Sequence, residues 1–247
     1  MKADPFVQLR LLELQGFDSA LDRLGHRRTS LPEIAEMARL DGLVDALRDA
    51  VVRSETEVSD LAREQAKFER EIDQVRTRRD RDRDRLGSGA ITVAKQLQEL
   101  EHEVATLGRR QSDLEDSELE VMERIETAQA ELDRLTALRA EHREARAAAE
   151  AGRDAAFVAI DAETERTVAE RAALAEGLPA DLLALYERLR ASEGGVGAGE
   201  ISRGRCGGCH LDLMNNEKTD IRGAAPDQVL RHEECGRIMV RTAESGL

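Results

Sequence analysis

The residues with the clearest chemical potential are three cysteines and one histidine near the C-terminus. Cys206 and Cys209 form a C-x-x-C pair, and His232 and Cys235 form an H-x-x-C pair after 22 intervening residues. Zinc prefers thiolate and imidazole ligands in a tetrahedron, and two such pairs supply all four. The spacing therefore predicts a closed, structural Cys3His site that holds one zinc ion per chain. We expect it in a small ribbon whose two knuckles are joined by a short β-hairpin.

Three other interpretations of these residues stay open. A redox C-x-x-C pair would need a thioredoxin-like βαβ context, which the sequence lacks. A degenerate ribbon without metal is the second alternative, because one knuckle has His where Cys is usual. The third is ligation by His210, but it adjoins Cys209, and neighbouring residues rarely both reach one tetrahedral ion. We therefore expect His210 to be a bystander or a residue that contacts a ligand without binding the ion. The other histidines stand alone in predicted helices: His26, His102 and His142.

The segments that must position this ribbon are predicted to be long helices. From Leu47 to Leu86, and again from Leu97 to Leu135, apolar residues recur in alternating steps of about four and three. The mean period of about 3.5 is that of a left-handed coiled coil, whereas a straight helix has about 3.6 residues per turn. The predicted seam positions are Leu47, Val51, Ser54, Val58, Leu61, Gln65, Phe68, Ile72, Val75, Arg79, Asp82 and Leu86, and then Leu97, Leu100, Val104, Leu107, Gln111, Leu114, Glu118, Val121, Ile125, Ala128, Leu132 and Leu135.

A short glycine-containing segment separates the two runs. Gly87 and Gly89 lie two positions apart, and glycines so placed end a helix and permit a tight reversal. Two coiled-coil helices joined by a short loop pack antiparallel. The alternative is one continuous helix, kinked at the glycines, in a parallel dimer. We favour a hairpin with its tip near 86–91, because both glycines would weaken the middle of a long seam.

The N-terminal region extends one arm of this hairpin. A helix over about 5–27 is predicted to break near 28–32. Ser30-Leu-Pro-Glu33 has the form of a capping box that begins a new helix over 33–86. The return arm is expected over 92–176, so that the two sides have similar lengths, roughly 120 Å at about 1.5 Å per residue.

Two domains follow from this organisation. Gly177-Leu-Pro179 ends the return arm, and the glycine-rich run 193–199 marks the entry to a different small domain. The predicted fold class is mainly α: a long antiparallel coiled-coil helical hairpin over 1–190, with a small C-terminal β zinc ribbon over 191–247. We expect the two modules to share little core.

Composition excludes several other classes of protein. The 247 residues are 36% charged and 2% aromatic, with no Trp, so most of the chain lacks the bulky side chains of a globular core. Abundant Ala, Leu, Glu and Arg are typical of long helices. No apolar run has the length of a membrane span, and the N-terminus lacks the pattern of a secretory signal. Together with the clustered cysteines, this predicts a cytoplasmic protein without membrane contact.

An arginine-rich segment lies at the predicted tip. The ten residues 76–85 contain six Arg and three Asp, a charge of +3 in a chain whose net charge is −14. One interpretation is a basic contact point for an acidic protein surface or for RNA. The other, which we favour, is a solvated helix end with interleaved ion pairs. The candidate contact residues are Arg76, Arg78, Arg79, Arg81, Arg83 and Arg85.

The remaining motifs are Leu178-Pro-Ala-Asp-Leu-Leu-Ala-Leu-Tyr-Glu-Arg-Leu189, Arg205-Cys-Gly-Gly-Cys-His210 and Glu234-Cys-Gly-Arg-Ile238. With the hairpin, they resemble a bacterial family of coiled-coil hairpin proteins that carry a C-terminal C4-type zinc ribbon. The resemblance implies zinc ligands at Cys206, Cys209 and Cys235, whereas the fourth ligand of the family is Cys where this chain has His232. It also implies an adaptor role, since some members are linked to alternative sigma factors, flagellar regulation and RNA.

An enzyme, a nucleic-acid-binding regulator and a protein adaptor are the candidate functions. An enzyme needs a water-excluding pocket with convergent groups, and a two-helix hairpin has no interior to hold one. A nucleic-acid-binding regulator would use the ribbon and the arginine-rich tip, but residues 200–247 carry seven Lys or Arg against eight Asp or Glu. The sequence therefore predicts a non-catalytic adaptor that binds protein partners and has no small-molecule substrate, with the nucleic-acid-binding regulator as the alternative.

Overall fold

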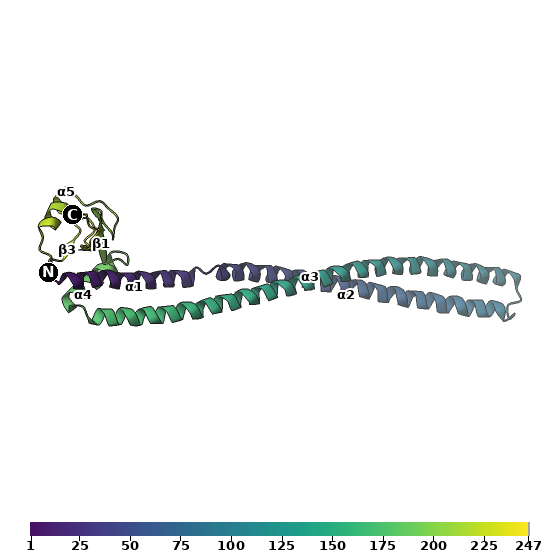
Figure 1. Ribbon diagram of the computed structural model, residues 1–247. Coiled ribbons are helices and arrows are strands. Elements are labelled where there is room, and N and C mark those ends of the chain that lie inside the picture. Colours follow the sequence, from purple (N-terminus) through teal and green to yellow (C-terminus); the bar gives the residue numbers. More distant parts are fainter. Residues whose placement is uncertain (247) are drawn as a thin grey trace. The chain divides into compact units, whose positions relative to one another are not determined.

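The computed structural model describes residues 1–246, which form long helices followed by a small mixed domain (Figure 1). The helices are α1 (Pro5–Thr29), α2 (Pro32–Gly87), α3 (Ala94–Glu176) and α4 (Ala180–Ser192). The small domain contains β1 (Ala198–Ser202), β2 (Arg205–Cys206), α5 (Asn215–Gly223), β3 (Leu230–Arg231) and β4 (Ile238–Val240). The predicted fold class, a long helical hairpin with a small C-terminal sheet, is confirmed. Among residues 1–246, no helix combines the length and the apolar character that crossing a membrane requires.

Two compact units make up the chain. The base unit comprises Met1–Ile34 and Glu150–Leu247, and the arm unit comprises Ala35–Ala149. The base unit therefore contains α1, α4 and the small domain, together with the start of α2 and the end of α3. The predicted domain boundary at residue 190 does not coincide with this division, because the small domain and the hairpin base fall in one unit.

The arm unit is built on the predicted seam. Every seam position named above is buried or half-buried. Val51, Leu61 and Ile72 of α2 are each at most 6% exposed, and α3 contributes the buried Leu114 and Val121. A repeat near 3.5 residues keeps one stripe of each helix facing its partner, so the seam of α2 and α3 is buried or half-buried throughout the arm unit. The sequence therefore predicted the register correctly.

The tip of the hairpin reverses the chain where the glycines predict it. Helix α2 ends at Gly87 and α3 begins at Ala94. Gly89 has φ of 71°, a left-handed conformation that glycine adopts without strain. Ser88 closes the end of α2, because its hydroxyl donates to the carbonyl of Arg85 at 2.8 Å. The hairpin interpretation is confirmed.

The break between α1 and α2 lies in the predicted place but is built differently. The backbone N–H and the hydroxyl of Ser30 both donate to the carbonyl of His26, at 3.0 and 2.8 Å. Ser30 therefore closes α1, and the predicted capping box at the start of α2 is wrong. Leu31, at the break itself, is buried with Leu24 and with Ile160 of α3. This contact anchors the interruption against the return arm.

The small domain is a four-stranded sheet with one helix. The strand order is β2-β1-β4-β3, in which β1 and β4 are parallel and the other neighbours are antiparallel. Strand β4 follows the second ligand pair and lies between β1 and β3. The chain between the two halves of the sheet forms α5, so the predicted β-hairpin connection between the knuckles is wrong.

The sheet and the hairpin base share one hydrophobic core, which corrects the expectation that the two modules share little. Leu11 and Leu14 of α1, Leu182 of α4 and Ile238 of β4 are all fully buried in the same cluster. Its buried members are Ala3, Leu11, Leu14, Leu178, Leu182, Leu185, Tyr186, Leu189, Ala198, Ile238 and Val240. Apolar faces on a short helix and a small sheet cannot bury enough area alone, and packing together removes both from water.

Candidate metal centre

The first knuckle depends on glycines that let two backbones approach closely. Gly207 donates its N–H to the carbonyl of Glu200 in β1 at 2.8 Å. A Cβ atom on Gly207 would lie 2.8 Å from that oxygen, and a Cβ on Gly199 would lie 2.4 Å from the nitrogen of Gly208. Only glycine fits at such distances. The C-x-x-C loop therefore curls directly against β1, with Cys206 at its buried start.

The second knuckle is a tight turn after β3. His232 donates its backbone N–H to the carbonyl of Arg237 at 3.0 Å, and Gly236 donates back to the carbonyl of His232 at 2.8 Å. Gly236 has φ of 68°, which allows the chain to reverse directly after Cys235. The turn directs the side chains of His232 and Cys235 toward the first knuckle.

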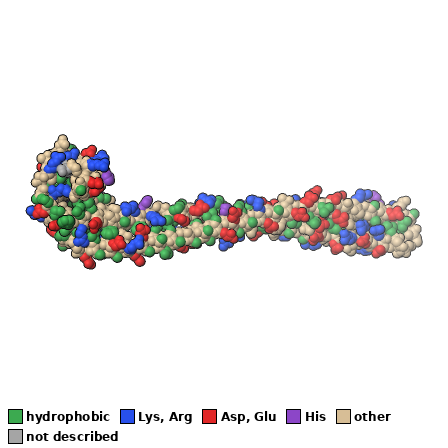
Figure 2. All heavy atoms as spheres, viewed as in Figure 1, with side chains coloured by type: hydrophobic (Ala, Val, Ile, Leu, Met, Phe, Trp, Pro, Cys, Tyr) green, Lys and Arg blue, Asp and Glu red, His purple; other side chains and the backbone are tan. Residues whose placement is uncertain are grey.

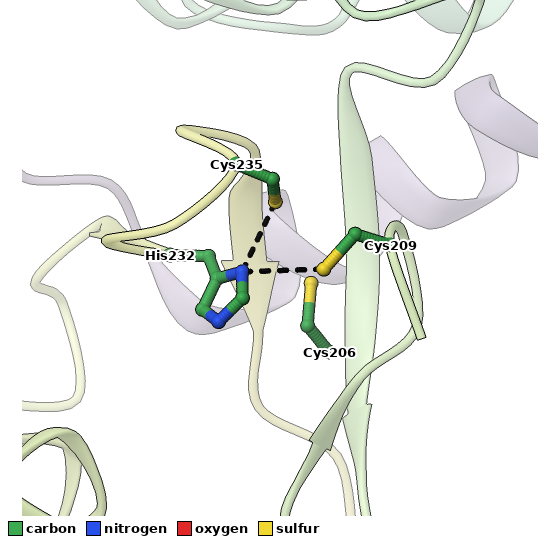
Figure 3. A group of neighbouring side chains, drawn as sticks. All are labelled: Cys206, Cys209, His232 and Cys235. Carbon is green, nitrogen blue, oxygen red and sulfur yellow. Dashed lines mark hydrogen bonds between the residues drawn. The ribbon is translucent and has the colours of Figure 1, made fainter. Parts of the chain in front are cut away.

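The four predicted ligands come together at one point (Figure 3). Their potential ligand atoms all lie within 4.8 Å of one another. Nδ1 of His232 is 3.3 Å from Sγ of Cys209 and 3.1 Å from Sγ of Cys235. Cys206 is fully buried and His232 is 1% exposed, while Cys209 and Cys235 are half-buried. The two knuckles are at least 23 positions apart in the sequence, so their side chains meet only through the fold of the sheet.

This arrangement fits zinc. A tetrahedral ion with zinc–sulfur bonds of about 2.3 Å holds its sulfur atoms roughly 3.8 Å apart. The observed cluster matches that size, and three sulfurs with one imidazole nitrogen are a donor set that zinc accepts. If zinc binds here, Cys206, Cys209, Cys235 and Nδ1 of His232 would hold it. A set of four protein ligands leaves no open position, as in structural sites.

The thiols of the cluster differ in acidity. Burial raises the pKa of the Cys206 thiol to about 11, although the backbone N–H groups of Cys209 and Gly208 partly offset this by stabilising the thiolate. Burial also acts to raise the pKa of Cys235, but hydrogen bonds from the backbone of Arg237 and from His232 outweigh it and lower the value to about 7. Such backbone N–H groups aimed at sulfur favour the charged form that a metal needs.

Helix α5 contributes a residue that sequence reasoning missed. Glu217 is 4% exposed, and its Oε1 lies 3.9 Å from Nε2 of His232. The signal in the sequence is weak: a glutamate at the third position of a short helix is typical of helix capping in general. Its position beside the histidine follows from the fold of α5 against the second knuckle.

His210 lies apart from the cluster. It is exposed and has φ of 64°, at the point where the chain leaves the first knuckle. His26 and His102 are exposed, and His142 is half-buried, each on a long helix. Within residues 1–246, the group of side chains able to hold a metal is the Cys3His set.

The arginines of the tip lie on the arm unit and are mostly paired with carboxylates. Arg76 and Arg78 reach across to Glu115 and Glu103 of α3. The pairs within α2 are Arg79 with Asp80, and Arg81 and Arg85 with Asp82. Arg83 is exposed. Residues 76–85 alone carry a charge of +3. With the start of the return arm included, residues 76–103 hold seven Lys or Arg against six Asp or Glu, so the charge of the tip as a whole is only +1.

Comparisons with known proteins agree with this architecture. A model of the CT398-like coiled coil hairpin domain matches residues 14–194, and a model of the C4-type zinc ribbon domain matches residues 205–239. An uncharacterized protein of Mycobacterium tuberculosis strain H37Rv is 42% identical over 245 residues, which cover 98% of each chain. An uncharacterized protein of Mycobacterium leprae is 34% identical over 227 residues, 90% of this chain and 95% of that one.

Solved structures show the same fold. A structure from Mycobacterium smegmatis has a TM-score of 0.83 and 38% identity, and the match covers 98% of this chain and all of that one. CT398 from Chlamydia trachomatis has a TM-score of 0.65 and 20% identity, over 96% of this chain and 98% of that one, which supports the fold alone. The chain therefore belongs to the CT398-like coiled-coil hairpin family and carries a C4-type zinc ribbon domain, with His232 in place of one cysteine.

Proposed function

We propose that this protein is a non-catalytic adaptor that binds other proteins through the outer surfaces of its hairpin and ribbon. The core shared by the ribbon and the hairpin base carries the proposal. Strands β1 and β4 pack on α1 and α4 in one buried cluster, so the ribbon is fixed on the helices. A rigid composite surface of this kind suits recognition of a folded partner, because little flexibility is lost on binding.

The ligand set of the proposed metal centre supports a structural role for the ion. Three thiols and one imidazole converge within 4.8 Å, and together they complete a tetrahedron. A catalytic zinc ion keeps a position for water or substrate. We therefore assign the ion to holding the two knuckles together, and we propose that the protein is not an enzyme.

Exposed apolar side chains support protein contacts. Phe6 and Leu9 of α1 are 79% and 38% exposed and lie one helical turn apart. Leu119 and Met122 of α3, at the same spacing in the arm unit, are 58% and 40% exposed. The seam does not use these side chains, which are the kind that anchors protein interfaces.

The charge distribution favours a protein partner over nucleic acid. Figure 2 shows acidic and basic side chains interleaved over the visible face of the arm unit. Most tip arginines already face a carboxylate, whereas phosphate binding needs a positive surface that is free to release counterions.

Three unpaired cysteines support a reducing compartment, and we therefore propose that the protein is cytoplasmic.

The proposal is tested by photocrosslinking with identification of the captured species. A crosslinking amino acid at position 6 or 119 of the full chain should capture a defined protein in cells. Capture should fall in the Phe6→Ser, Leu9→Ser double variant, or in Leu119→Ser, Met122→Ser, for the matching position. Val158→Ser is the matched control, because Val158 is 72% exposed and lacks a large exposed apolar neighbour at that spacing.

Two results would count against the adaptor. One is capture of nucleic acid in place of protein, with the salt dependence expected of phosphate contacts. The other is capture that both apolar double variants leave unchanged, which would show that these surfaces take no part in binding.

A further inference from the structure

Glu217 lies directly behind the histidine of the proposed metal centre. Its side chain is 4% exposed, in the first turn of α5. Among the described residues, the basic side chain within ion-pair range of Glu217 is His232, with Nε2 at 3.9 Å from Oε1. A carboxylate buried this deeply needs compensating donors, so its surroundings indicate what it does.

Two backbone groups fix the position of this carboxylate. Oε2 of Glu217 accepts from the N–H of Met214 at 2.9 Å, which closes the start of α5. Oε1 accepts from the N–H of Glu233 at 3.1 Å, and Glu233 directly follows the histidine in the second knuckle. The carboxylate therefore ties α5 to the knuckle and stays beside the imidazole.

His232 presents a different nitrogen to each side. Nδ1 faces the sulfurs of Cys209 and Cys235 (Figure 3). Nε2 is buried and has no hydrogen-bond partner within residues 1–246. A neutral imidazole that binds a metal through Nδ1 must carry its proton on Nε2. Oε1 of Glu217 lies 3.9 Å from Nε2, and a shift of roughly 1 Å would bring the two atoms to hydrogen-bond distance.

We propose that Glu217 is a positioning residue for the metal centre. It accepts a hydrogen bond from Nε2–H of His232 and thereby selects the tautomer and the ring orientation in which Nδ1 binds the ion. The inference rests on the proposed zinc site. It also accounts for the histidine: a fourth thiolate at position 232 would be repelled by the buried carboxylate, whereas an imidazole offers it an N–H.

This role gives opposite expectations in two backgrounds. In the chain with His232, Glu217→Gln should weaken zinc binding by about 10- to 100-fold, the usual effect of losing such a partner. In His232→Cys, the same change removes a repulsive charge and should leave zinc affinity unchanged or raise it. His232→Cys alone should not bind more tightly than the natural chain, although the four-cysteine pattern of the family would suggest that it does.

Zinc affinity is measured by chelator competition on the full chain in all four combinations of these two changes. Glu234→Gln is the matched control for charge, because Glu234 is exposed and adjoins the ligand Cys235; it should leave the affinity near that of the natural chain. Nitrogen NMR of the zinc-bound chain gives a separate readout, and should show His232 protonated at Nε2.

The outcomes separate the inference from the site on which it rests. Equal loss of affinity on Glu217→Gln in both backgrounds would mean that the carboxylate only holds α5 in place, and would overturn the inference. A proton on Nδ1 in the zinc-bound chain would do the same. If the natural chain takes up no zinc, the metal centre itself fails, and the inference fails with it.

Discussion

Asp18 is the residue whose removal should most directly loosen the packing of the helices in the base unit. It lies on α1 and is 1% exposed. It accepts hydrogen bonds from Arg171 of α3, at 2.6 and 3.2 Å, and from the hydroxyl of Tyr186 of α4, at 2.6 Å. Arg190 approaches it at 3.4 Å. One carboxylate therefore joins three helices at the edge of the shared core.

The magnitude follows from what Asp18→Ala leaves behind. Loss of one partner of a buried ion pair costs about 3–5 kcal/mol, because the remaining charge stays buried and uncompensated. Here Arg171 and Arg190 keep 22% and 27% of their side chains exposed, so both retain some water, and Arg171 keeps its contact with Glu187. The loss should lie at the lower end, about 3 kcal/mol of unfolding free energy for the base unit.

The assay uses a natural probe. Tyr186 is the only Tyr in the chain, which contains no Trp, so tyrosine fluorescence during urea unfolding reports the base unit, and circular dichroism reports the helices of both units. Asp18→Ala should move the fluorescence transition to clearly lower urea. The matched control is Asp22→Ala, one turn further along α1. Asp22 is 54% exposed and pairs with Arg190 at 3.1 Å, so its loss should cost less than about 1 kcal/mol.

Equal shifts for Asp18→Ala and Asp22→Ala would refute this reasoning, because burial would then have no influence on the cost. A fluorescence transition unchanged in Asp18→Ala would show that the carboxylate does not join α1 to α4.

Four further outcomes are expected. Leu61→Asp, at a seam position that is 4% exposed, should lower the unfolding free energy by about 3 kcal/mol, measured by circular dichroism. Val52→Asp, at a position of the same helix that is 53% exposed, should change it by less than about 1 kcal/mol. Removal of zinc by a chelator, or His232→Ala, should alter the fluorescence of Tyr186, because the ribbon and α4 share a core. Unchanged Tyr186 fluorescence in both cases would contradict this. Burial and Asp18 raise the pKa of Tyr186, so its stabilisation is complete below the unfolded value of about 10 and declines as the pH rises above it. Phenolate absorbance should therefore appear only as the base unit unfolds, and its appearance in the folded chain near pH 10 would be the contrary result. Zinc uptake at pH 7 should release the proton of Cys206, whose pKa is raised to about 11, and a pH-indicator titration that detects no proton release would count against ligation by this thiol.

The local features of the hairpin could be predicted because they depend on periodicity and on chain conformation. The repeat of about 3.5 residues placed every seam position on the buried face. The glycines at 87 and 89 marked the reversal, and Pro32 marked the interruption between the first two helices. The capping-box prediction was wrong because Ser30 lies between the end of α1 and the start of α2 and can cap either. Its hydroxyl donates to the carbonyl of His26 and so caps the end of α1.

The connection and docking of the ribbon could not be predicted in this way. The segment 215–223 has Ile221 as its one apolar side chain, so its helical pattern is weak. Helix α5 forms because the core buries Ile221 and the second knuckle holds Glu217. The shared core was missed because its members come from four separated stretches of the chain, each of which reads as an ordinary amphipathic segment.

The sequence alone determined the long helices of the hairpin, the register of the seam, the point of reversal and the four candidate ligands, because each depends on residues close together in the chain or on a recognisable spacing. The tertiary structure decided what surrounds those ligands. It placed the carboxylate of Glu217 beside His232 and Asp18 between Arg171 and Tyr186. The partners in these contacts are up to 168 residues apart, and only the packing of the whole base unit brings them together, since no local pattern encodes which distant side chains will share a buried site.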